Sequence, residues 1–251
     1  MSLKVCTDAL LMDLVPPARI ASVTYLSREK AALRLWPEAA ALPVNHNTAE
    51  EVLAQKPDLI VTDTFTAPAM RALIAKSGAR MVEIPPAEDF AGIRRATRQL
   101  AAAVGETARG EELIARMDAV LTKLAKDSPP RPIRVAGWGG GGYVPGRGTL
   151  FDATLRAAGA QNIAGAGDGF YDVEALLAAR PDILAFGDDY ADTPSLRADQ
   201  DSHPVLMRYF AHRRVSYPSA LLGCGVPQSA QAAAQLRAAL LRAMQKPGGM
   251  P

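Results

Sequence analysis

The feature that most constrains this chain is a segment that occurs twice. Residues 50–61 and 174–185 align at a constant offset, with identical Glu, Leu, Ala, Pro and Asp and close replacements at most other positions. Each copy begins with a short amphipathic pattern that predicts a helix, and its Pro-Asp pair predicts a break before a buried strand. Although αβ units can match by chance, an ordered second pair, Asp8-Ala9 and Asp152-Ala153, favours two related halves.

A long helical stretch separates these halves. Apolar residues recur at helical spacing over 106–126, and Pro129, Pro130 and Pro132 end the pattern. We therefore expect an N-terminal αβ lobe at 1–104, a linking helix at 105–128 and a C-terminal αβ lobe at 129–251. Strands that alternate with helices form parallel sheets, and such sheets bind ligands at the carboxyl ends of their strands. The predicted fold class is thus α/β, with a ligand cleft between two lobes.

The same patterns give approximate bounds for individual elements. The first half opens with an expected strand and helix at 3–6 and 8–15, and another strand is expected at 19–23. Further strands are expected at 57–62, 80–84, 133–138, 182–186 and 213–217.

Composition narrows the function. The 251 residues are 49% hydrophobic and carry a net charge of +2, which suits a protein with a sizeable core and gives no reason to expect nucleic acid as a partner. The apolar runs are too short to span a membrane. The start lacks the pattern of a secretory signal, so we expect either a cytoplasmic protein or a mature exported protein with Met1–Leu3 added.

A glycine-rich stretch, 139–142, follows the strand expected at 133–138 and precedes Tyr143. It lacks the Gly-Lys-Ser/Thr of a phosphate-binding loop, and no helix begins within the glycines, as dinucleotide binding requires. Two interpretations stay open, a flexible turn and a ligand-binding loop in which Trp138, Tyr143 and Arg147 supply stacking and charge. A nucleotide-binding enzyme is the alternative function.

Signals for metal binding and catalysis are weak. The three histidines are His46, His203 and His212, and the last two share no helix face. We expect all three to lie on the surface, and His46, between Asn45 and Asn47, could line the cleft. There is no Gly-x-Ser-x-Gly motif and no histidine next to either cysteine. We therefore expect no metal site, no cofactor and no catalytic residue.

The two cysteines, Cys6 and Cys224, each follow an expected strand, one in each half. An extracytoplasmic disulfide and two inert thiols are both consistent with this placement. A bond between them would tie the two lobes together at the edge of the cleft.

Loop side chains just past the expected strands are the candidate ligand contacts, because aromatic rings there suit a large flat or amphipathic ligand. Arg147 would clamp a ligand carboxylate or phosphate. The predicted set is Thr7, Asp8, Tyr25, Phe65, Trp138, Tyr143, Arg147, Tyr171, Asp189 and Tyr190.

The chain resembles the helical-hinge (class III) substrate-binding proteins of ABC importers, the group that includes vitamin B12-binding and iron-siderophore-binding proteins. The resemblance lies in residues 50–60, in 147–164 and in the terminal helix expected from Pro227 to Met244. It implies a periplasmic, monomeric protein without catalytic residues. Such a protein would capture a bulky corrinoid, iron-siderophore or haem-like molecule and deliver it to a membrane permease.

One departure concerns that permease. Related proteins often carry a glutamate on a surface helix of the first lobe, but Thr66–Arg71, the matching stretch, has none. We therefore expect docking through the acidic stretch 188–201 of the second lobe, with Asp199 and Asp201 as the contacts. A sensor or scaffold that uses the same fold without transport remains a further alternative.

Overall fold

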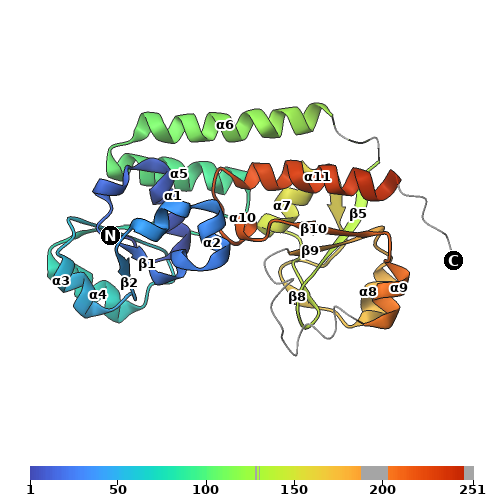
Figure 1. Ribbon diagram of the computed structural model, residues 1–251, viewed down its shortest axis with the longest axis horizontal. Coiled ribbons are helices and arrows are strands. Elements are labelled where there is room, and N and C mark those ends of the chain that lie inside the picture. Colours follow the sequence, from blue (N-terminus) through green and yellow to red (C-terminus); the bar gives the residue numbers. More distant parts are fainter. Residues whose placement is uncertain (128, 130, 188–202, 246–251) are drawn as a thin grey trace. The chain divides into compact units, whose positions relative to one another are not determined.

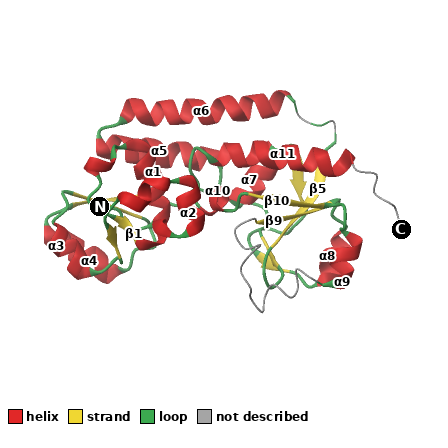
Figure 2. Ribbon diagram, viewed as in Figure 1, coloured by secondary structure: helices red, strands yellow, loops and turns green. Residues whose placement is uncertain are grey.

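A computed structural model describes residues 1–127, 129, 131–187 and 203–245 and divides the chain into two compact units (Figure 1). Unit 1 comprises residues 1–87, 91–115 and 223–227, and unit 2 comprises 88–90, 116–222 and 228–251. Both units combine helices with parallel strands (Figure 2), which confirms the predicted α/β class. Unit 1 is not one continuous stretch, because it includes a short segment from the C-terminal part of the chain.

Unit 1 contains two pairs of parallel strands, β1 with β2 and β3 with β4. Residues 1–3 lie between the pairs, because the Ser2 amide donates to the Ser22 carbonyl and the Leu3 amide to the Val61 carbonyl, at 3.0 and 2.9 Å. The elements are α1 (Val5–Leu14), η1 (Pro17–Arg19), β1 (Val23–Thr24), η2 (Tyr25–Arg28), α2 (Lys30–Leu35), η3 (Pro37–Ala41), β2 (Val44–Asn45), α3 (Ala49–Gln55), β3 (Leu59–Thr62), α4 (Pro68–Ser77), β4 (Arg80–Glu83) and α5 (Phe90–Val104). Helix α6 (Thr107–Lys126) contributes its first part.

The core of unit 1 forms around α1, which is buried on most of its surface, and α5 packs against it through Leu100 and Ala101. Helix α6 crosses α5 closely at Gly110, where a Cβ atom would lie 2.6 Å from the Ala101 Cβ. Only glycine permits that approach. The presence of Gly110 inside the predicted linking helix is therefore explained by its close packing against α5 rather than by a need for flexibility.

The first elements differ from the prediction. The chain enters a helix at Val5, so the strand expected at 3–6 is limited to the bridge that Ser2 makes with Val61. The strand expected at 19–23 is mostly absent, since Pro17 starts a 3-10 helix and only Val23–Thr24 pairs. In both segments the apolar pattern is real, but residues 5–6 belong to helix α1, and only the end of segment 19–23 pairs as a strand.

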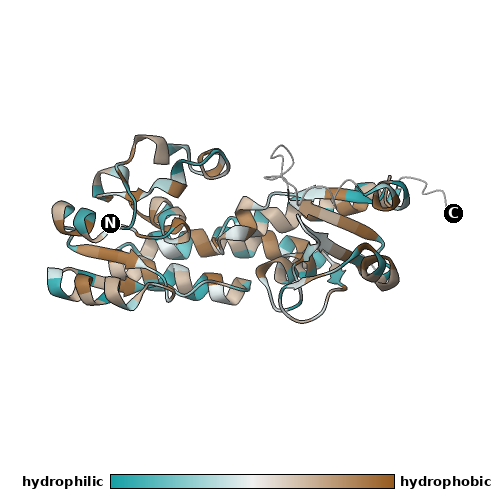
Figure 3. Ribbon diagram, turned by 90° about the horizontal axis from the view of Figure 1, so that it is seen from below, coloured by the Kyte–Doolittle hydropathy of each residue, from teal (hydrophilic) through white to brown (hydrophobic). Residues whose placement is uncertain are grey.

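Unit 2 is built on a parallel sheet with the order β10-β9-β5-β7. Alternate side chains of its strands pack against α7 and α11 on one face and against α8 and α9 on the other. Figure 3 shows brown, apolar segments on strands of the protein beside paler and teal ones. The elements are β5 (Ile133–Trp138), β6 (Tyr143–Val144), α7 (Leu150–Ala157), β7 (Ala160–Asn162), β8 (Gly169–Phe170), α8 (Val173–Ala179), β9 (Ile183–Gly187), α9 (Pro204–Tyr209), β10 (Arg214–Tyr217), α10 (Ala220–Gly223) and α11 (Ser229–Gln245). The sequence did not predict the antiparallel pair β6–β8.

The repeated segment has the same local structure in both units. Helices α3 and α8 are capped at their N-termini by Thr48 and Asp172, whose side chains accept hydrogen bonds from the amide three residues on. Both end in a left-handed residue, Lys56 at φ 44° and Arg180 at φ 49°, immediately before the repeated proline. The parallel strands β3 and β9 follow, as the sequence predicts.

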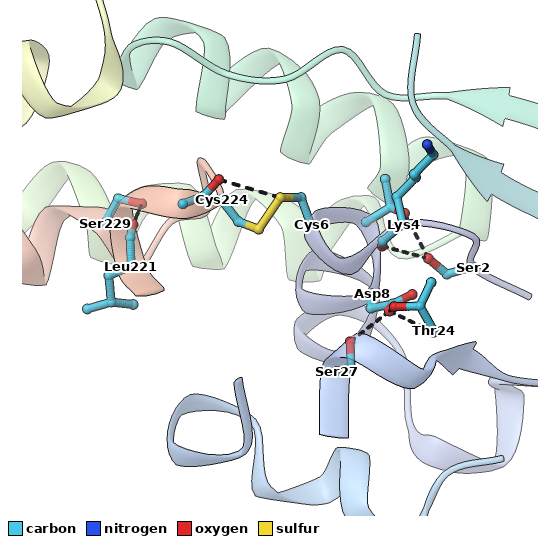
Figure 4. Close-up of a disulfide and its surroundings, with 11 residues drawn as sticks. Ser2, Lys4, Cys6, Asp8, Thr24, Ser27, Leu221, Cys224 and Ser229 are labelled. Carbon is cyan, nitrogen blue, oxygen red and sulfur yellow. Dashed lines mark hydrogen bonds between the residues drawn. A yellow bond between two sulfur atoms is a disulfide. The ribbon is translucent and has the colours of Figure 1, made fainter. Parts of the chain in front are cut away.

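Cys6 and Cys224 form a disulfide with Cα atoms 5.0 Å apart (Figure 4). Contrary to the sequence-based placement, Cys6 lies in the first turn of α1 and Cys224 follows α10, and both belong to unit 1. The bond therefore fastens segment 223–227 to α1. Gly225 is closely packed there, since its Cβ would lie 2.6 Å from the Ala87 Cβ.

We expect the disulfide to contribute strongly to stability, because it closes a loop with a sequence separation of 218 residues. Chain entropy alone predicts a loss of about 5 kcal/mol in the free energy of unfolding for the Cys6→Ser, Cys224→Ser variant. Urea unfolding of the variant and of the wild type measures this loss. Alkylation of the unreduced, denatured wild type should label no thiol, and two labelled thiols would contradict the bond.

Candidate ligand-binding site

Aromatic rings follow three strands of unit 1 at the carboxyl ends of those strands. Tyr25 follows β1, His46 follows β2 and Phe65 lies in the turn after β3. Tyr25 is 49% exposed, Phe65 is 76% exposed, and the His46 side chain is 61% exposed. We call Tyr25, His46 and Phe65 the first edge; its members are available to a ligand, and Tyr25 and Phe65 were predicted from the sequence.

Thr7 and Asp8, also predicted as ligand contacts, are buried instead. The Thr7 hydroxyl donates to the Lys4 carbonyl at 2.9 Å within the first turn of α1. Asp8 is fully buried, and its Oδ2 accepts from the Thr24 amide and hydroxyl and from the Ser27 hydroxyl at 2.6–2.8 Å (Figure 4). Asp8 therefore fixes the turn that carries Tyr25 rather than touching a ligand.

Burial dominates the charge state of Asp8 and raises the pKa of its carboxyl above the usual value, although hydrogen bonds from Ser2, Thr24 and Ser27 oppose the shift. Its second oxygen, Oδ1, is buried and has no hydrogen-bond partner. A buried carboxyl that is only half satisfied makes the Tyr25 turn sensitive to pH.

His46 is held by a carboxylate. Glu51 accepts the His46 backbone amide on Oε2 at 2.7 Å and contacts the ring Nδ1 with Oε1 at 2.9 Å. Glu51 is itself fixed at the start of α3 by a capping box with Thr48. The hydrogen bond to the His46 ring, with the backbone and Thr48 bonds, lowers the pKa of Glu51 to about 2. The Tyr25 ring stacks on the His46 ring with centroids 5.2 Å apart.

The matching surface of unit 2 lies after β5, where the chain forms a small double loop. Phe170 is 72% exposed and meets the half-buried Tyr143 ring edge-on at 6.0 Å, with Arg147 exposed beside the same loop in the sequence. Burial, and then a hydrogen bond with Asp168, raises the pKa of Tyr143 to about 12, so this phenol stays neutral. We call Tyr143, Arg147, Asp168 and Phe170 the second edge.

The glycine-rich stretch is an ordered part of this loop. The Gly139 amide donates to the Tyr143 carbonyl, and the Tyr171 amide donates to the Gly142 carbonyl. The Arg147 amide donates to the Gly165 carbonyl, and the Gly167 amide donates to the Arg147 carbonyl. Helix α7 begins only at Leu150, behind the N-cap Thr149, so no helix N-terminus adjoins the glycines. The glycines therefore adjoin no helix N-terminus that could bind phosphate, and the backbone hydrogen bonds of the loop hold the segments that carry Tyr143 and Phe170.

The remaining predicted contacts have other positions. Trp138 is 1% exposed and packs in the core of unit 2, and the half-buried Tyr171 accepts from the Gly165 amide through its hydroxyl at 3.2 Å. Asp189, Tyr190, Asp199 and Asp201 lie outside the described residues. The predicted set omitted His46, Asp168 and Phe170. The sequence offered two signals for this region: polar residues flank His46, and Phe170 is next to the predicted contact Tyr171.

No group of three or more His, Cys, Asp and Glu residues is arranged to hold a metal ion within the described parts of the chain. A cavity of about 560 Å³ occurs in unit 1, but it lies at the opposite ends of the strands, near Asp58 and Arg80. It is therefore separate from the first edge.

Comparison with known proteins identifies the class to which this arrangement belongs. The fold resembles that of the periplasmic heme-binding protein RhuT from Roseiflexus sp. RS-1, in its apo form, with 23% identity, a TM-score of 0.76, and 97% and 98% of the two chains covered. The vitamin B12 binding protein BtuF of Vibrio cholerae has 18% identity and a TM-score of 0.71, with 98% and 97% covered. The molybdate binding protein MolA of Haemophilus influenzae has 19% identity and a TM-score of 0.78, with 98% and 87% covered.

Residues 39–200, more than half of the chain, match the family model described as "Periplasmic binding protein". The chain belongs to this family. Its members are transport-related solute binders rather than enzymes, which confirms the expected absence of enzymatic activity and implies an extracytoplasmic location. No curated protein matches the sequence. Among the described helices, none has the length and apolar character of a membrane span.

We expect Asp8→Ala to destabilise the protein by about 3 kcal/mol, because three donors at Thr24 and Ser27 lose their acceptor. Asp8→Asn keeps an acceptor oxygen and removes the charge. Urea unfolding of both variants at one pH measures the loss in the free energy of unfolding for each. A larger loss for Asp8→Asn than for Asp8→Ala would contradict the role of Asp8 as a hydrogen-bond acceptor.

The raised pKa of Asp8 also predicts a pH dependence. A carboxyl that holds its proton more tightly when folded stabilises the protein below the unfolded pKa of about 4, and this contribution is lost as the pH rises through the higher folded pKa. The stability of the wild type relative to Asp8→Asn should therefore fall from pH 4 upward. A difference that stays constant with pH would show that Asp8 titrates normally.

The double loop of unit 2 predicts a contrast between two glycines. A Cβ atom at Gly146 would lie 1.6 Å from the Gly167 carbonyl oxygen, whereas a Cβ at Gly165 would have nothing within 4 Å. Gly146→Ala should cost about 1–3 kcal/mol and change the near-ultraviolet circular dichroism of the tyrosines. Gly165→Ala is the matched control, and equal effects of the two substitutions would contradict the packing described.

Proposed function

We propose that this protein is the binding protein of an ABC importer and captures a flat, metal-containing macrocycle, either haem-like or a corrinoid, in the periplasm. The observation that carries the proposal is the pair of exposed aromatic edges, with Phe65 at 76% and Phe170 at 72% exposure. Two large exposed rings, one in the turn after β3 and one in the short strand β8, are poorly explained by packing, whereas they suit stacking on a ligand of similar shape.

The chemistry of the edges separates ligand classes. A small oxyanion such as molybdate would be bound through hydrogen bonds and charge, and it would leave the rings of Phe65 and Phe170 in water. A porphyrin or corrin ring offers a broad apolar face to these rings, and Arg147 would pair with a peripheral carboxylate of a haem-like porphyrin. An iron-siderophore, the other ligand expected from the sequence, presents a less continuous flat face and is the second choice.

Delivery to a permease by a monomer is part of the proposal. The acidic contacts Asp199 and Asp201 stay a prediction, supported by the local excess of Asp over Arg in stretch 188–201. Within Thr66–Arg71, the first-unit stretch that lacks glutamate, the Arg71 side chain pairs with Glu83. Because Thr66–Arg71 contains no acidic side chain, we propose that this stretch supplies no acidic contact to the permease.

A binding panel tests the ligand class. Hemin, metal-free protoporphyrin IX, aquocobalamin and molybdate are titrated separately while thermal unfolding is followed, since a ligand at 100 times its Kd adds about 2.7 kcal/mol. We expect stabilisation by at least one macrocycle and none by molybdate. Stabilisation by molybdate alone would overturn the proposal.

Aromatic variants then locate the contacts. Phe65→Ala and Phe170→Ala should each lower macrocycle affinity by about 3- to 10-fold, the value of one stacked ring. Leu53→Ala is the control, because Leu53 is 48% exposed on α3 outside the first edge. A macrocycle affinity unchanged in both phenylalanine variants would remove the assigned contacts.

A further inference from the structure

The amino ends of the strands in unit 2 carry an excess of positive charge. Strands β5, β9 and β10 are adjacent and parallel, and they begin at nearly the same level in the sheet. The segments that lead into them, 131–134, 180–183 and 211–214, contain five arginines, one histidine and one carboxylate, Asp182. We call the basic residues of these segments, together with Arg208 of α9, the basic edge: Arg131, Arg134, Arg180, Arg208, His212, Arg213 and Arg214.

Part of this charge has a structural role. The Arg134 guanidinium group donates to two carbonyls at the end of α8, at 2.9 and 3.4 Å, and the Arg213 guanidinium group donates to the Tyr209 carbonyl at the end of α9, at 2.9 Å. The carbonyls at a helix C-terminus favour a nearby cation. These contacts also hold both guanidinium groups at the amino end of the sheet.

The rest of the charge is more open to solvent. Arg131, Arg180 and Arg208 are exposed, and so is His212. Asp182 accepts a hydrogen bond from the Arg134 backbone amide at 2.9 Å. One partly buried carboxylate thus faces several cations, and the basic edge keeps a net positive charge that a partner of opposite charge can meet.

Exposed apolar side chains lie next to this charge on α9, which packs beside α8 on one face of the sheet (Figure 1). Val205 and Tyr209 are one helical turn apart and are 45% and 39% exposed. Arg208 is exposed in the same turn. The Arg213 guanidinium carbon lies 4.8 Å from the centre of the Tyr209 ring. The apolar face of α9 is therefore continuous with the basic edge.

We propose that the basic edge and the exposed face of α9 bind the surface of a bilayer that contains anionic phospholipid. Guanidinium groups pair with phosphate in a bidentate geometry. Tyrosine rings suit the headgroup level of a bilayer, and an apolar side chain beside them enters the acyl boundary. The second edge follows the carboxyl end of β5, at the opposite end of the same sheet, so this contact leaves it uncovered.

Two observations favour a bilayer over an acidic protein as the partner. The cations are spread over the starts of three neighbouring strands and the end of α9, which suits the many equivalent phosphates of a lipid surface. An exposed tyrosine in contact with an arginine also has the amphipathic character of residues at a membrane interface. In addition, the family implies an extracytoplasmic location, in a compartment that a membrane bounds.

Vesicle sedimentation tests the proposal with the whole chain and no added macrocycle. One preparation contains equal parts of phosphatidylglycerol and phosphatidylcholine, and the other contains phosphatidylcholine alone. We expect the wild type to bind the anionic vesicles, to bind the neutral ones far more weakly, and to be released by added salt, which screens exposed charges. Equal binding to both preparations, or binding to neither, would overturn the proposal.

Arginine variants then locate the surface. Arg131→Gln and Arg208→Gln should each weaken binding to the anionic vesicles by about 5-fold, the contribution of one arginine near such a surface. Arg95→Gln is the matched control, because it removes the same charge from an exposed arginine of α5 in unit 1. A control that loses as much affinity as the two variants would show that net charge alone attracts the lipid, and would overturn the assignment to unit 2.

Val205→Ser tests the apolar part of the surface. It should weaken binding by about 3- to 10-fold and leave the salt dependence unchanged, because it removes apolar area and no charge. Leu53→Ser, at a leucine that is 48% exposed on α3, is the control and should match the wild type. Circular dichroism and thermal unfolding establish that each variant is folded. An affinity unchanged in Val205→Ser would overturn the role given to α9.

Polyglutamate distinguishes an acidic protein from a lipid surface. If it binds the wild type while the anionic vesicles do not, the basic edge belongs to a protein interface and the membrane proposal is overturned. No macrocycle enters any of these measurements. Their failure therefore leaves the proposed ligand class standing, and a failure of the ligand panel leaves this inference standing.

Discussion

The turn that ends α3 and α8 sets the geometry on which the rest of this protein depends. In both units a left-handed basic residue, Lys56 or Arg180, is followed by Pro-Asp, so the helix stops and a buried strand begins at once. The strands that follow pair in parallel, and their carboxyl ends come to one edge of each sheet. Tyr25, His46 and Phe65 follow the carboxyl ends of strands in unit 1, whereas Phe170 lies in the short antiparallel strand β8.

The sequence predicted the repeated helix–strand segment well, because its periodicity and its Pro-Asp breaks depend on local chemistry. It also predicted that Tyr25 and Phe65 lie just past strands, and the structure shows both side chains exposed there. It could not distinguish Asp8, fully buried beneath the Tyr25 turn, from a cleft residue, because burial depends on contacts distant in sequence. Trp138 was misplaced for the same reason, as one residue of register decides whether a strand end points into the core.

The structure uses carboxylates of opposite character to support one aromatic pair. Asp8 is desolvated and has a raised pKa, whereas Glu51 is half-buried, accepts several hydrogen bonds and has a lowered pKa. Asp8 holds the Tyr25 turn by accepting hydrogen bonds from Thr24 and Ser27. Glu51 orients the His46 ring through its contacts with the His46 amide and Nδ1. Rigid supports of this kind reduce the entropy that a binding surface loses when its ligand arrives, so the first edge is prepared before the ligand binds.

The position of Cys224 has a consequence for how the chain acquires its structure. Segment 223–227 belongs to unit 1, where Val226 joins the same core as Leu10 and Leu100, and the disulfide attaches it to the first turn of α1. Unit 1 therefore lacks part of its core until segment 223–227 has been synthesised. Unit 2 likewise needs α11 for its core, so the two units interleave along the chain, and residues 1–115 alone form an incomplete folding unit.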